Sequence, residues 1–309
     1  MSRSVFIDGA AGTTGLEIRE RLAARAELRV VVLDEAQRKD HAARREALNA
    51  SEFVILCLPD DAAREAVALI DNPSTRVVDA SSAHRVADGW TYGFAELEPD
   101  AADRIASAVH VTNPGCYPTG FLALVRPLVR AGLVPAEWPL SIAATSGYSG
   151  GGKAMIAEFE EGAQPPAFRA YAMGLAHKHV AEMTQHAGLV HPPIFAPAVV
   201  NTYRGMVVEV PLPLHALPGR PALADLHDAL ADTYRGSSVV SVAAGNPATV
   251  SIEENAGTDR LTLRVCGNDD ARQARLVATL DNLGKGAAGA AVQNLNIMAG
   301  LDPVAGLVL

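Results

Sequence analysis

The sequence has few cysteines. Three occur in 309 residues, at Cys57, Cys116 and Cys266, and an odd number cannot pair completely within one chain. Three are also too few to stabilise a chain of this length through disulfides, so we expect a reduced, cytoplasmic setting. The role of these three cysteines is therefore the first question that the sequence raises.

Long apolar runs and an excess of positive charge are also missing. No stretch approaches the ~20 residues that cross a bilayer, and Asp8 ends the first apolar run, Val5–Ile7, so we expect neither a membrane span nor a signal peptide. The formal net charge of −9 argues against a nucleic-acid-binding surface. That charge still permits a small basic pocket for a phosphorylated ligand.

Aromatic residues make up only 5% of the chain, so the core must consist mainly of Val, Leu, Ile and Ala. The hydrophobic share of 49% and the charged share of 20% are typical of soluble globular proteins and exclude disorder as the main state. At roughly 100–200 residues per domain, the length predicts two domains.

The first third of the chain alternates strand-like and helix-like patterns. The strand-like runs are 5–7, 28–33, 53–58 and 77–78, and the helix-like stretches between them are 16–22, 38–49 and 61–70. A continuous apolar run such as 53–58 is typical of a strand covered on both faces. This order predicts a parallel sheet in a doubly wound, dinucleotide-binding domain.

The pattern changes after residue 111. A helix is predicted over 119–129, and the later strand-like runs are 141–145, 207–210, 239–242, 261–266 and 276–280. We predict a dinucleotide-binding domain at 1–115 and an α+β catalytic and oligomerisation domain at 116–285. The latter should contain an antiparallel sheet, and a C-terminal helix within 286–309 should return to the first domain. Such sheets often form subunit contacts, so we expect a homodimer or homotetramer.

A glycine-rich turn follows the first predicted strand. Gly9, Gly12 and Gly15 stand at a Gly-x-x-Gly-x-x-Gly spacing, with Thr13 and Thr14 between the last two. Glycines here permit a tight turn and let backbone N–H groups approach a pyrophosphate at the positive end of a helix. The usual spacing is Gly-x-Gly-x-x-Gly, and an ordinary strand-to-helix turn is the alternative. The alternation of strands and helices around the turn favours nucleotide binding.

Charged residues after the second predicted strand bear on the choice of cofactor. Asp34 stands where an acidic residue binds the ribose 2′-hydroxyl of NAD. Arg38 and Lys39 follow it and could bind the 2′-phosphate of NADP instead, although all three residues could also be solvated charges at a helix start. We favour NADP.

Cys116 is the most informative residue. It follows Asn113-Pro114-Gly115 and is expected at the start of a helix. A thiol at a helix N-terminus faces aligned N–H dipoles that favour the thiolate, so we predict a nucleophile at this position. Cys57 and Cys266 lie in apolar strand patterns and are expected to be small buried hydrophobic residues.

A histidine pair is the second candidate for chemistry. His177 and His179 lie close to Glu182, and in a helix the carboxylate of Glu182 could orient the imidazole of His179. Proton transfer near neutral pH requires such a group. A solvated histidine pair is the alternative. We predict no metal, because no Cys or His pair at zinc-finger spacing accompanies these histidines.

Two further loops could bind anions or carboxylates. One runs from Asp79 to Arg85 after a strand end, and the other runs from Ser149 to Lys153 before a helical pattern. Arg85 could grip a carboxylate or phosphate with paired donors. Ordinary surface-loop chemistry explains both loops equally well.

The segment 113–119, Asn-Pro-Gly-Cys-Tyr-Pro-Thr, resembles the active-site signature of N-acetyl-γ-glutamyl-phosphate reductases. The other segments that match that family's pattern are 9–15, 79–85, 177–182, 281–287 and 291–294. The similarity spans nearly the whole chain, whose length is that of the shorter form of the enzyme. Ala288 departs from the pattern, since many relatives carry Ser there, and we expect the change to be tolerated.

The resemblance implies an α/β Rossmann-type NADP-binding domain joined to an α+β catalytic and dimerisation domain. Aspartate-semialdehyde and glyceraldehyde-3-phosphate dehydrogenases share that architecture but flank their cysteine differently. The implied reaction is the NADPH-dependent reduction of N-acetyl-γ-glutamyl phosphate to N-acetyl-L-glutamate 5-semialdehyde and phosphate, a step of arginine biosynthesis.

The resemblance also implies roles for residues. Cys116 would be the nucleophile that forms a thioester, and His179 the acid/base, with Glu182 and His177 beside it. The implied cofactor-binding residues are Gly9, Gly12, Thr13, Thr14, Gly15, Arg38, Lys39, Ser81, Ser82, Asn282, Lys285 and Gly286. The implied substrate-binding residues are Arg85, Asn113, Ser149 and Gly150.

Two other functions stay open at the level of sequence. One is the same chemistry on another acyl phosphate, such as aspartyl phosphate. The other is a non-catalytic NADP-binding sensor, which should form no acyl-enzyme. The presence of Cys116 together with an acid/base candidate argues against the sensor.

Overall fold

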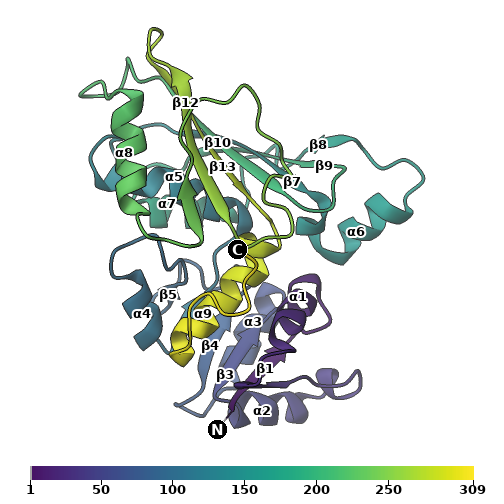
Figure 1. The fold of residues 1–309 in the computed structure, drawn as a ribbon. Helices are drawn as coiled ribbons and strands as arrows, with labels where there is room; N and C mark the ends of the chain where they lie inside the picture. The colour runs from purple at the N-terminus through teal and green to yellow at the C-terminus, as the bar shows by residue number, and fades with distance from the viewer. Residues whose placement is uncertain (1) are drawn as a thin grey trace. The chain divides into compact units, whose positions relative to one another are not determined.

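The computed structural model describes residues 2–309, which form two compact units (Figure 1). Unit 1 comprises the chain through Gly115 together with Ala287–Leu307. Unit 2 comprises Cys116–Gly286 and the last residues, Val308–Leu309. Among residues 2–309, no helix is both long and apolar enough to cross a membrane.

Unit 1 contains a parallel sheet with the strand order β2-β1-β3-β4-β6-β5. Its strands are β1 (Arg3–Asp8), β2 (Leu28–Val31), β3 (Phe53–Leu56), β4 (Arg76–Asp79), β5 (Thr91–Tyr92) and β6 (His110–Thr112). The parallel, doubly wound sheet predicted from the sequence is confirmed. Strand β2 lies on one side of β1 and β3 lies on the other, so the strand order reverses between β1 and β3. In folds of this type ligands bind at such a reversal, outside the carboxyl ends of the strands.

Helices cover both faces of this sheet, because both faces are apolar. Phe53 and Ile55 of β3 pack into one hydrophobic cluster, and Val54 and Leu56 pack into another. The first cluster also receives side chains from α1 (Thr13–Leu22), α4 (Ala101–Ser107) and α9 (Gly289–Ala299). The second receives side chains from α2 (His41–Ala50) and α3 (Asp60–Ala68). A π-helical turn, Gly284–Ala288, leads into α9, which is buried along its whole length.

Unit 2 contains a mixed sheet with the order β11-β12-β13-β10-β7-β9-β8. Its strands are β7 (Ser141–Gly147), β8 (Phe168–Ala170), β9 (Ile194–Val200), β10 (Met206–Leu212), β11 (Val240–Val242), β12 (Leu261–Asn268) and β13 (Gln273–Leu280). Strands β12 and β13 form an antiparallel hairpin. The expectation of an antiparallel sheet is wrong for two pairs, since β7 pairs with β9, and β11 with β12, in parallel. Parallel neighbours need long connections, and the connection from β7 to β9 contains two helices.

Four helices accompany the sheet of unit 2. They are α5 (Cys116–Arg130), α6 (Gly152–Glu161), α7 (His179–Ala187) and α8 (Leu223–Thr233). Helix α5 is buried over most of its length and packs on β10, β12 and β13 as well as on α7 and α8. Pro118 fits in its first turn, where a backbone N–H would have no helical partner. The central position of α5 fixes the place of its first residue, Cys116.

Candidate active site

The glycine turn after β1 accepts no side chains at two of its positions. Gly9 has φ 88°, and a Cβ added there would lie 2.3 Å from the carbonyl oxygen of Cys57. A Cβ on Gly15 would lie 2.4 Å from the carbonyl oxygen of Gly9. Helix α1 begins after Gly12, which supplies no side-chain cap. Bare backbone and uncapped N–H groups beside the β1–β3 reversal fit the pyrophosphate of a dinucleotide.

The charged residues after β2 have two different settings. Asp34 caps a turn, whereas Arg38 and Lys39 are cations on the surface. The carboxylate of Asp34 accepts hydrogen bonds from the backbone N–H groups of Ala36 and Gln37, at 3.0 and 2.8 Å. Arg38 and Lys39 lie in an exposed 3-10 turn, and Arg38 pairs with Glu35 at 2.6 Å. Asp34 therefore stabilises the turn, while the two cations face solvent.

The loop after β4 is organised around a fully buried carboxylate. Asp79 accepts hydrogen bonds from the backbone N–H and the hydroxyl of Ser81, at 2.8 and 2.7 Å, and from Nδ1 of His84 at 2.6 Å. The hydroxyl of Ser82 donates to Asp60. Arg85 is buried and donates to the carbonyl of Ala80. The loop is therefore a fixed structure rather than a solvated surface turn.

Two histidines sandwich a tryptophan beside this loop. The ring of His84 stacks on Trp90 with centroids 4.2 Å apart, and Trp90 stacks on His110 with centroids 4.8 Å apart. Burial and the neighbouring His84 lower the pKa of His110. The stack holds His84 against Asp79 from the side.

Asn113 is a buried clamp within unit 1. Its backbone N–H donates to the carbonyl of Asp79, and its side-chain amide donates to the carbonyl of Ala287 at 2.9 Å. Its side-chain oxygen accepts from Asn294 of α9 at 3.1 Å. Asn113 thus ties β4, the end of β6 and the start of α9 together. Asn294 is a polar residue of this network to which the sequence analysis assigned no role.

Cys116 is the first residue of α5, as its predicted role requires. A Cβ on Gly286 would lie 2.9 Å from the Cβ of Cys116, so only glycine lets this turn pass so close to the cysteine. The other two cysteines, expected to be buried, are half-buried. Burial raises the pKa of Cys57 to about 12, and burial also raises the pKa of Cys266.

The predicted histidine pair lies near the same end of α5. The ring centroids of His177 and His179 are 6.2 and 5.9 Å from that of Tyr117, the residue after Cys116. Packing of α5 on α7 places them there. His179 begins α7, and Glu182 lies one turn further along the same helix, with both residues buried. The stretch is helical from His179 onward, so His179 and Glu182 are i, i+3 neighbours.

Two phenols join this group, and no role was predicted for either from the sequence. The hydroxyl of Tyr171 donates to that of Tyr117 at 3.3 Å, and the hydroxyl of Tyr117 donates to the carbonyl of Ala198 at 3.0 Å. Burial raises the pKa of both, that of Tyr171 to about 12. Both are therefore neutral hydrogen-bond donors. Tyr117 stands within the recognisable signature, whereas no local pattern marks Tyr171.

The loop after β7 is fixed by one amide. Asn282 donates from its side-chain nitrogen to the hydroxyl of Ser149 at 2.8 Å, and its side-chain oxygen accepts from the backbone N–H of Gly205. The hydroxyl of Ser149 donates to the carbonyl of Tyr203. A Cβ on Gly150 would lie 3.2 Å from the hydroxyl oxygen of Ser146. Asn282 and Ser149 therefore use their side chains to shape this loop.

Asp281 stabilises the turn that contains Lys285 and Gly286. This buried carboxylate accepts from the backbone N–H groups of Gly257 and Leu283, and Arg204 lies 3.3 Å from it. The backbone N–H of Gly286 donates to the carbonyl of Asp281. Lys285 is buried as well. Asp281 and Arg204 stabilise the turn, and no role was predicted for either from the sequence.

The predicted residues thus fall into two groups. Those of unit 1 are Gly9, Gly12, Thr13, Thr14, Gly15, Arg38, Lys39, Ser81, Ser82, Arg85 and Asn113. Those of unit 2 are Cys116, Ser149, Gly150, His177, His179, Glu182, Asn282, Lys285 and Gly286. Within unit 2, the nucleophile candidate, the histidine pair and the Gly286 turn lie together.

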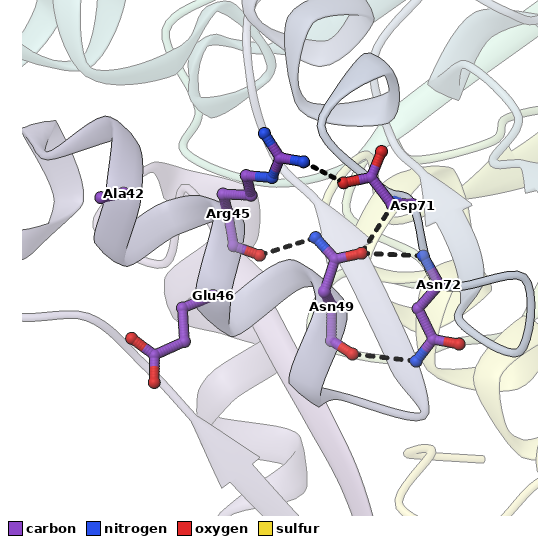
Figure 2. A pocket seen from close by; sticks show the side chains of 6 residues that line it. All are labelled: Ala42, Arg45, Glu46, Asn49, Asp71 and Asn72. Atoms are coloured by element: carbon purple, nitrogen blue, oxygen red, sulfur yellow. Dashed lines mark hydrogen bonds and ion pairs between the residues drawn. The ribbon is translucent and has the colours of Figure 1, made fainter.

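Figure 2 shows a surface pocket in unit 1 that none of these residues lines. It is lined by Ala42, Arg45, Glu46, Asn49, Asp71 and Asn72. The amide of Asn49 donates to the carbonyls of Arg45 and Leu69, and its oxygen accepts from the backbone N–H groups of Asp71 and Asn72. These bonds join the end of α2 to the chain after α3, so this pocket is the surface of a structural clip.

Comparison with known proteins bears on both units. The semialdehyde dehydrogenase NAD binding domain matches residues 4–105, and the semialdehyde dehydrogenase dimerisation domain matches residues 116–282. An N-acetyl-gamma-glutamyl-phosphate reductase of Brucella anthropi is 50% identical, over 97% of this chain and 99% of its own.

Solved structures share the fold at low identity. Aspartate semialdehyde dehydrogenase II of Vibrio cholerae covers 97% of this chain and 99% of its own, with a TM-score of 0.71 and 18% identity. Aspartate semialdehyde dehydrogenase of Candida albicans, solved with NADP, covers 97% of this chain and 99% of its own, with a TM-score of 0.68 and 13% identity. At these identities the likeness concerns the fold alone.

Proposed function

The chain belongs to the N-acetyl-gamma-glutamyl-phosphate reductases, within the semialdehyde dehydrogenases, and from that membership we propose which of its residues carry the reaction. The protein reduces N-acetyl-γ-glutamyl phosphate with NADPH to N-acetyl-L-glutamate 5-semialdehyde and phosphate, a step of arginine biosynthesis. The observation that carries the assignment of roles is the position of Cys116 as the first residue of α5, the helix that packs on the histidine-bearing α7.

Cys116 is the nucleophile. The helix N-terminus favours its thiolate, which attacks the acyl carbon and breaks the bond to phosphate, so phosphate leaves with the electron pair and a thioester forms on the sulfur. The nicotinamide cofactor, when bound, supplies a hydride to that carbon. Backbone N–H groups at the start of α5 stabilise the oxyanion. His179 donates a proton to this oxyanion. It then removes the proton again as the carbon–sulfur bond breaks, which releases the aldehyde and restores the thiolate.

The cofactor residues follow the glycine geometry. The backbone N–H groups of the turn bind the pyrophosphate. The turn residues are Gly9, Gly12, Thr13, Thr14 and Gly15, and no side chain fits at Gly9 or Gly15, so backbone is exposed there. Arg38 and Lys39 bind the 2′-phosphate, a role that suits exposed cations. The remaining proposed cofactor-binding residues are Ser81, Ser82, Asn282, Lys285 and Gly286.

The substrate residues act by charge and by shape. Arg85 binds a carboxylate or phosphate of the substrate. Asn113 contributes to the substrate site from its buried position after β6. Ser149 and Gly150 act through the backbone of their loop, because the Ser149 hydroxyl already bonds to Asn282 and Tyr203. Glu182 orients His179 from one helical turn away.

Unit 2 matches a dimerisation domain, and we infer a homodimer or homotetramer. Light scattering after gel filtration tests this, since a monomer at micromolar concentration would contradict it. A cytoplasmic location stays a prediction from the small, odd number of cysteines, and fractionation of cells tests it.

The decisive experiment runs the reaction in reverse with purified protein, N-acetylglutamate semialdehyde, phosphate and NADP, and records NADPH by absorbance. We expect Cys116→Ser to lower kcat by at least ~10³-fold, because the nucleophile is lost. Cys266→Ser is the matched control and should keep wild-type rates, since that thiol has a raised pKa and lies in a strand. Near-normal, phosphate-dependent turnover by Cys116→Ser would exclude it as the nucleophile.

A further inference from the structure

We infer that His177 is a positioning residue, which caps α7 through its Nδ1 atom and so holds His179 in place for proton transfer. The role of His179 rests on the proposed function, whereas the cap rests on geometry alone. His177, expected from the sequence only to stand beside the acid/base, thereby has a role of its own.

The start of α7 needs a cap that its own residues do not provide. The first N–H groups of a helix have no helical partner, and a Ser, Asp or Asn side chain usually accepts one of them. Here the position before the helix is Lys178, with φ −56° and ψ −23° and no side-chain cap. The N-terminus must therefore be satisfied from elsewhere.

His177 supplies two acceptors to that N-terminus. Its Nδ1 atom accepts the backbone N–H of His179 at 3.1 Å, and its carbonyl oxygen accepts the backbone N–H of Val180 at 3.0 Å. A ring nitrogen that accepts an N–H carries no proton of its own. His177 is thus neutral in this arrangement, with its hydrogen on Nε2.

Three aromatic rings keep the imidazole of His177 in this orientation. Its centroid lies 6.2 Å from that of Tyr117 on α5, 5.7 Å from that of Tyr171 after β8, and 5.2 Å from that of Phe195 on β9. All three contacts are edge-on. Neighbours from three segments of the chain therefore restrict the rotation of the ring.

His179 has a different setting. It is the buried first residue of α7, its ring lies 4.6 Å from that of His177, and Glu182 is one turn further along the helix. Fraying of the first turn of α7 would displace His179 before any later residue of the helix. The cap at His177 and the function of His179 are therefore coupled through one hydrogen bond.

Three substitutions of His177 test the cap directly. Asn places an acceptor where Nδ1 lies, Gln places its polar atoms nearer to Nε2, and Ala removes both. Amide hydrogen exchange at His179 should remain near the wild-type rate in His177→Asn and rise roughly fivefold in His177→Gln and His177→Ala, as loss of a typical cap predicts. Unchanged protection in all three variants would overturn the cap, and the Asn–Gln comparison decides even where Ala fails to fold.

Kinetics separate positioning from proton transfer. His179→Asn should lower kcat by about 10²–10⁴-fold. His177→Gln should lower kcat with little change in KM, and His177→Asn should restore most of that loss with the wild-type pH profile. A loss in His177→Asn as large as in His179→Asn, with the His179 amide still protected, would make His177 the acid/base. Absence of NADP-dependent turnover in the wild type would refute the proposed function instead, and the exchange rates would still decide the cap.

Discussion

Gly9 illustrates how a single backbone position constrains the protein. Its φ of 88° lies in the left-handed region, and an added Cβ would meet the Cys57 carbonyl at 2.3 Å. We expect Gly9→Ala to lower the free energy of unfolding by about 2–4 kcal/mol, because backbone strain and a clash with backbone add. Gly89→Ala is the matched control, since Gly89 has φ 79° with nothing within 4 Å of an added Cβ.

The control should lose only about 1 kcal/mol, the effect of φ alone. Urea unfolding of both variants measures the difference, which is the contribution of the contact with the Cys57 carbonyl. Equal losses would show that the steric contact has no influence. Gly9→Ala should also weaken NADP binding, which titration calorimetry measures.

His110 leads to a prediction about how the stability of the protein depends on pH. Burial and the nearby His84 lower the pKa of His110 in the folded protein, whereas an unfolded histidine titrates near ~6.5. The unfolded chain therefore binds the proton more readily. The stabilising effect of neutral His110 is complete above about pH 6.5 and is lost as the pH falls from there toward the lowered pKa.

Urea midpoints between about pH 7 and pH 5 check this sign. The wild-type midpoint should fall more steeply than that of His110→Asn. His41→Asn is the control, because the His41 side chain is 63% exposed, and it should keep the wild-type slope. A His110→Asn slope equal to that of the wild type would exclude His110 as a source of acid sensitivity.

At the scale of elements, the loop after β4 depends on one carboxylate. Asp79 accepts three hydrogen bonds from Ser81 and His84 in a fully buried position. In Asp79→Asn an amide NH₂ replaces one acceptor oxygen and faces donors, so we expect a loss of about 2–3 kcal/mol in the free energy of unfolding.

The same substitution should raise KM for the acyl phosphate, because Arg85 lies in this loop. Trp90 reports on the loop through its stack with His84, and its fluorescence is resolved in a Trp138→Phe background. Asp100→Asn is the control, because this exposed carboxylate only pairs with Arg104. Unchanged KM and fluorescence in Asp79→Asn would show that the loop holds its shape without the carboxylate.

Elements with strong local patterns were predictable from the sequence, and others were not. The parallel sheet of unit 1 follows from the apolar runs at β1, β3 and β4, which are covered on both faces. Strand β5 is only two residues long, too short for a period to show. Strand β9 contains Pro197, which interrupts the usual strand pattern. The parallel pairing of β7 with β9 is a tertiary outcome that neither segment encodes locally.

The candidate site divides in the same way. Cys116 and Gly9 were predictable because their chemistry depends on adjacent residues, a helix start and a strand-to-helix turn. Tyr171 and Arg204 were not, because each acts through a partner distant in sequence, Tyr117 or Asp281. Local spacing carries no information about such pairs.

At the scale of the whole molecule, unit 1 is completed by the end of the chain. Helix α9 is buried along its length and packs on α1, α4 and β4, as Figure 1 shows with α9 in yellow. Asn296 accepts a hydrogen bond from Arg25, and the carbonyl of Met298 accepts one from Arg76. The first hydrophobic cluster of unit 1 therefore cannot close until α9 has been synthesised.

Cofactor binding to unit 1 should stabilise the protein, and the size of the effect reports cofactor choice. A ligand at 100 times its Kd raises the free energy of unfolding by about 2.7 kcal/mol. Arg38 and Lys39 are exposed cations after β2, while Asp34 is occupied in capping its turn. We therefore expect NADP to raise the melting temperature more than an equal concentration of NAD.

Replacing both cations, as Arg38→Ala with Lys39→Ala, should remove most of that difference by weakening NADP binding alone. Arg45→Ala is the matched control, because Arg45 is an exposed cation of the same unit that lines the pocket in Figure 2 and pairs with Asp71. It should leave the preference for NADP intact. If the double variant kept the full difference between NADP and NAD, the 2′-phosphate would have to be bound by residues other than Arg38 and Lys39, and the preference for NADP would have a different origin from the turn after β2.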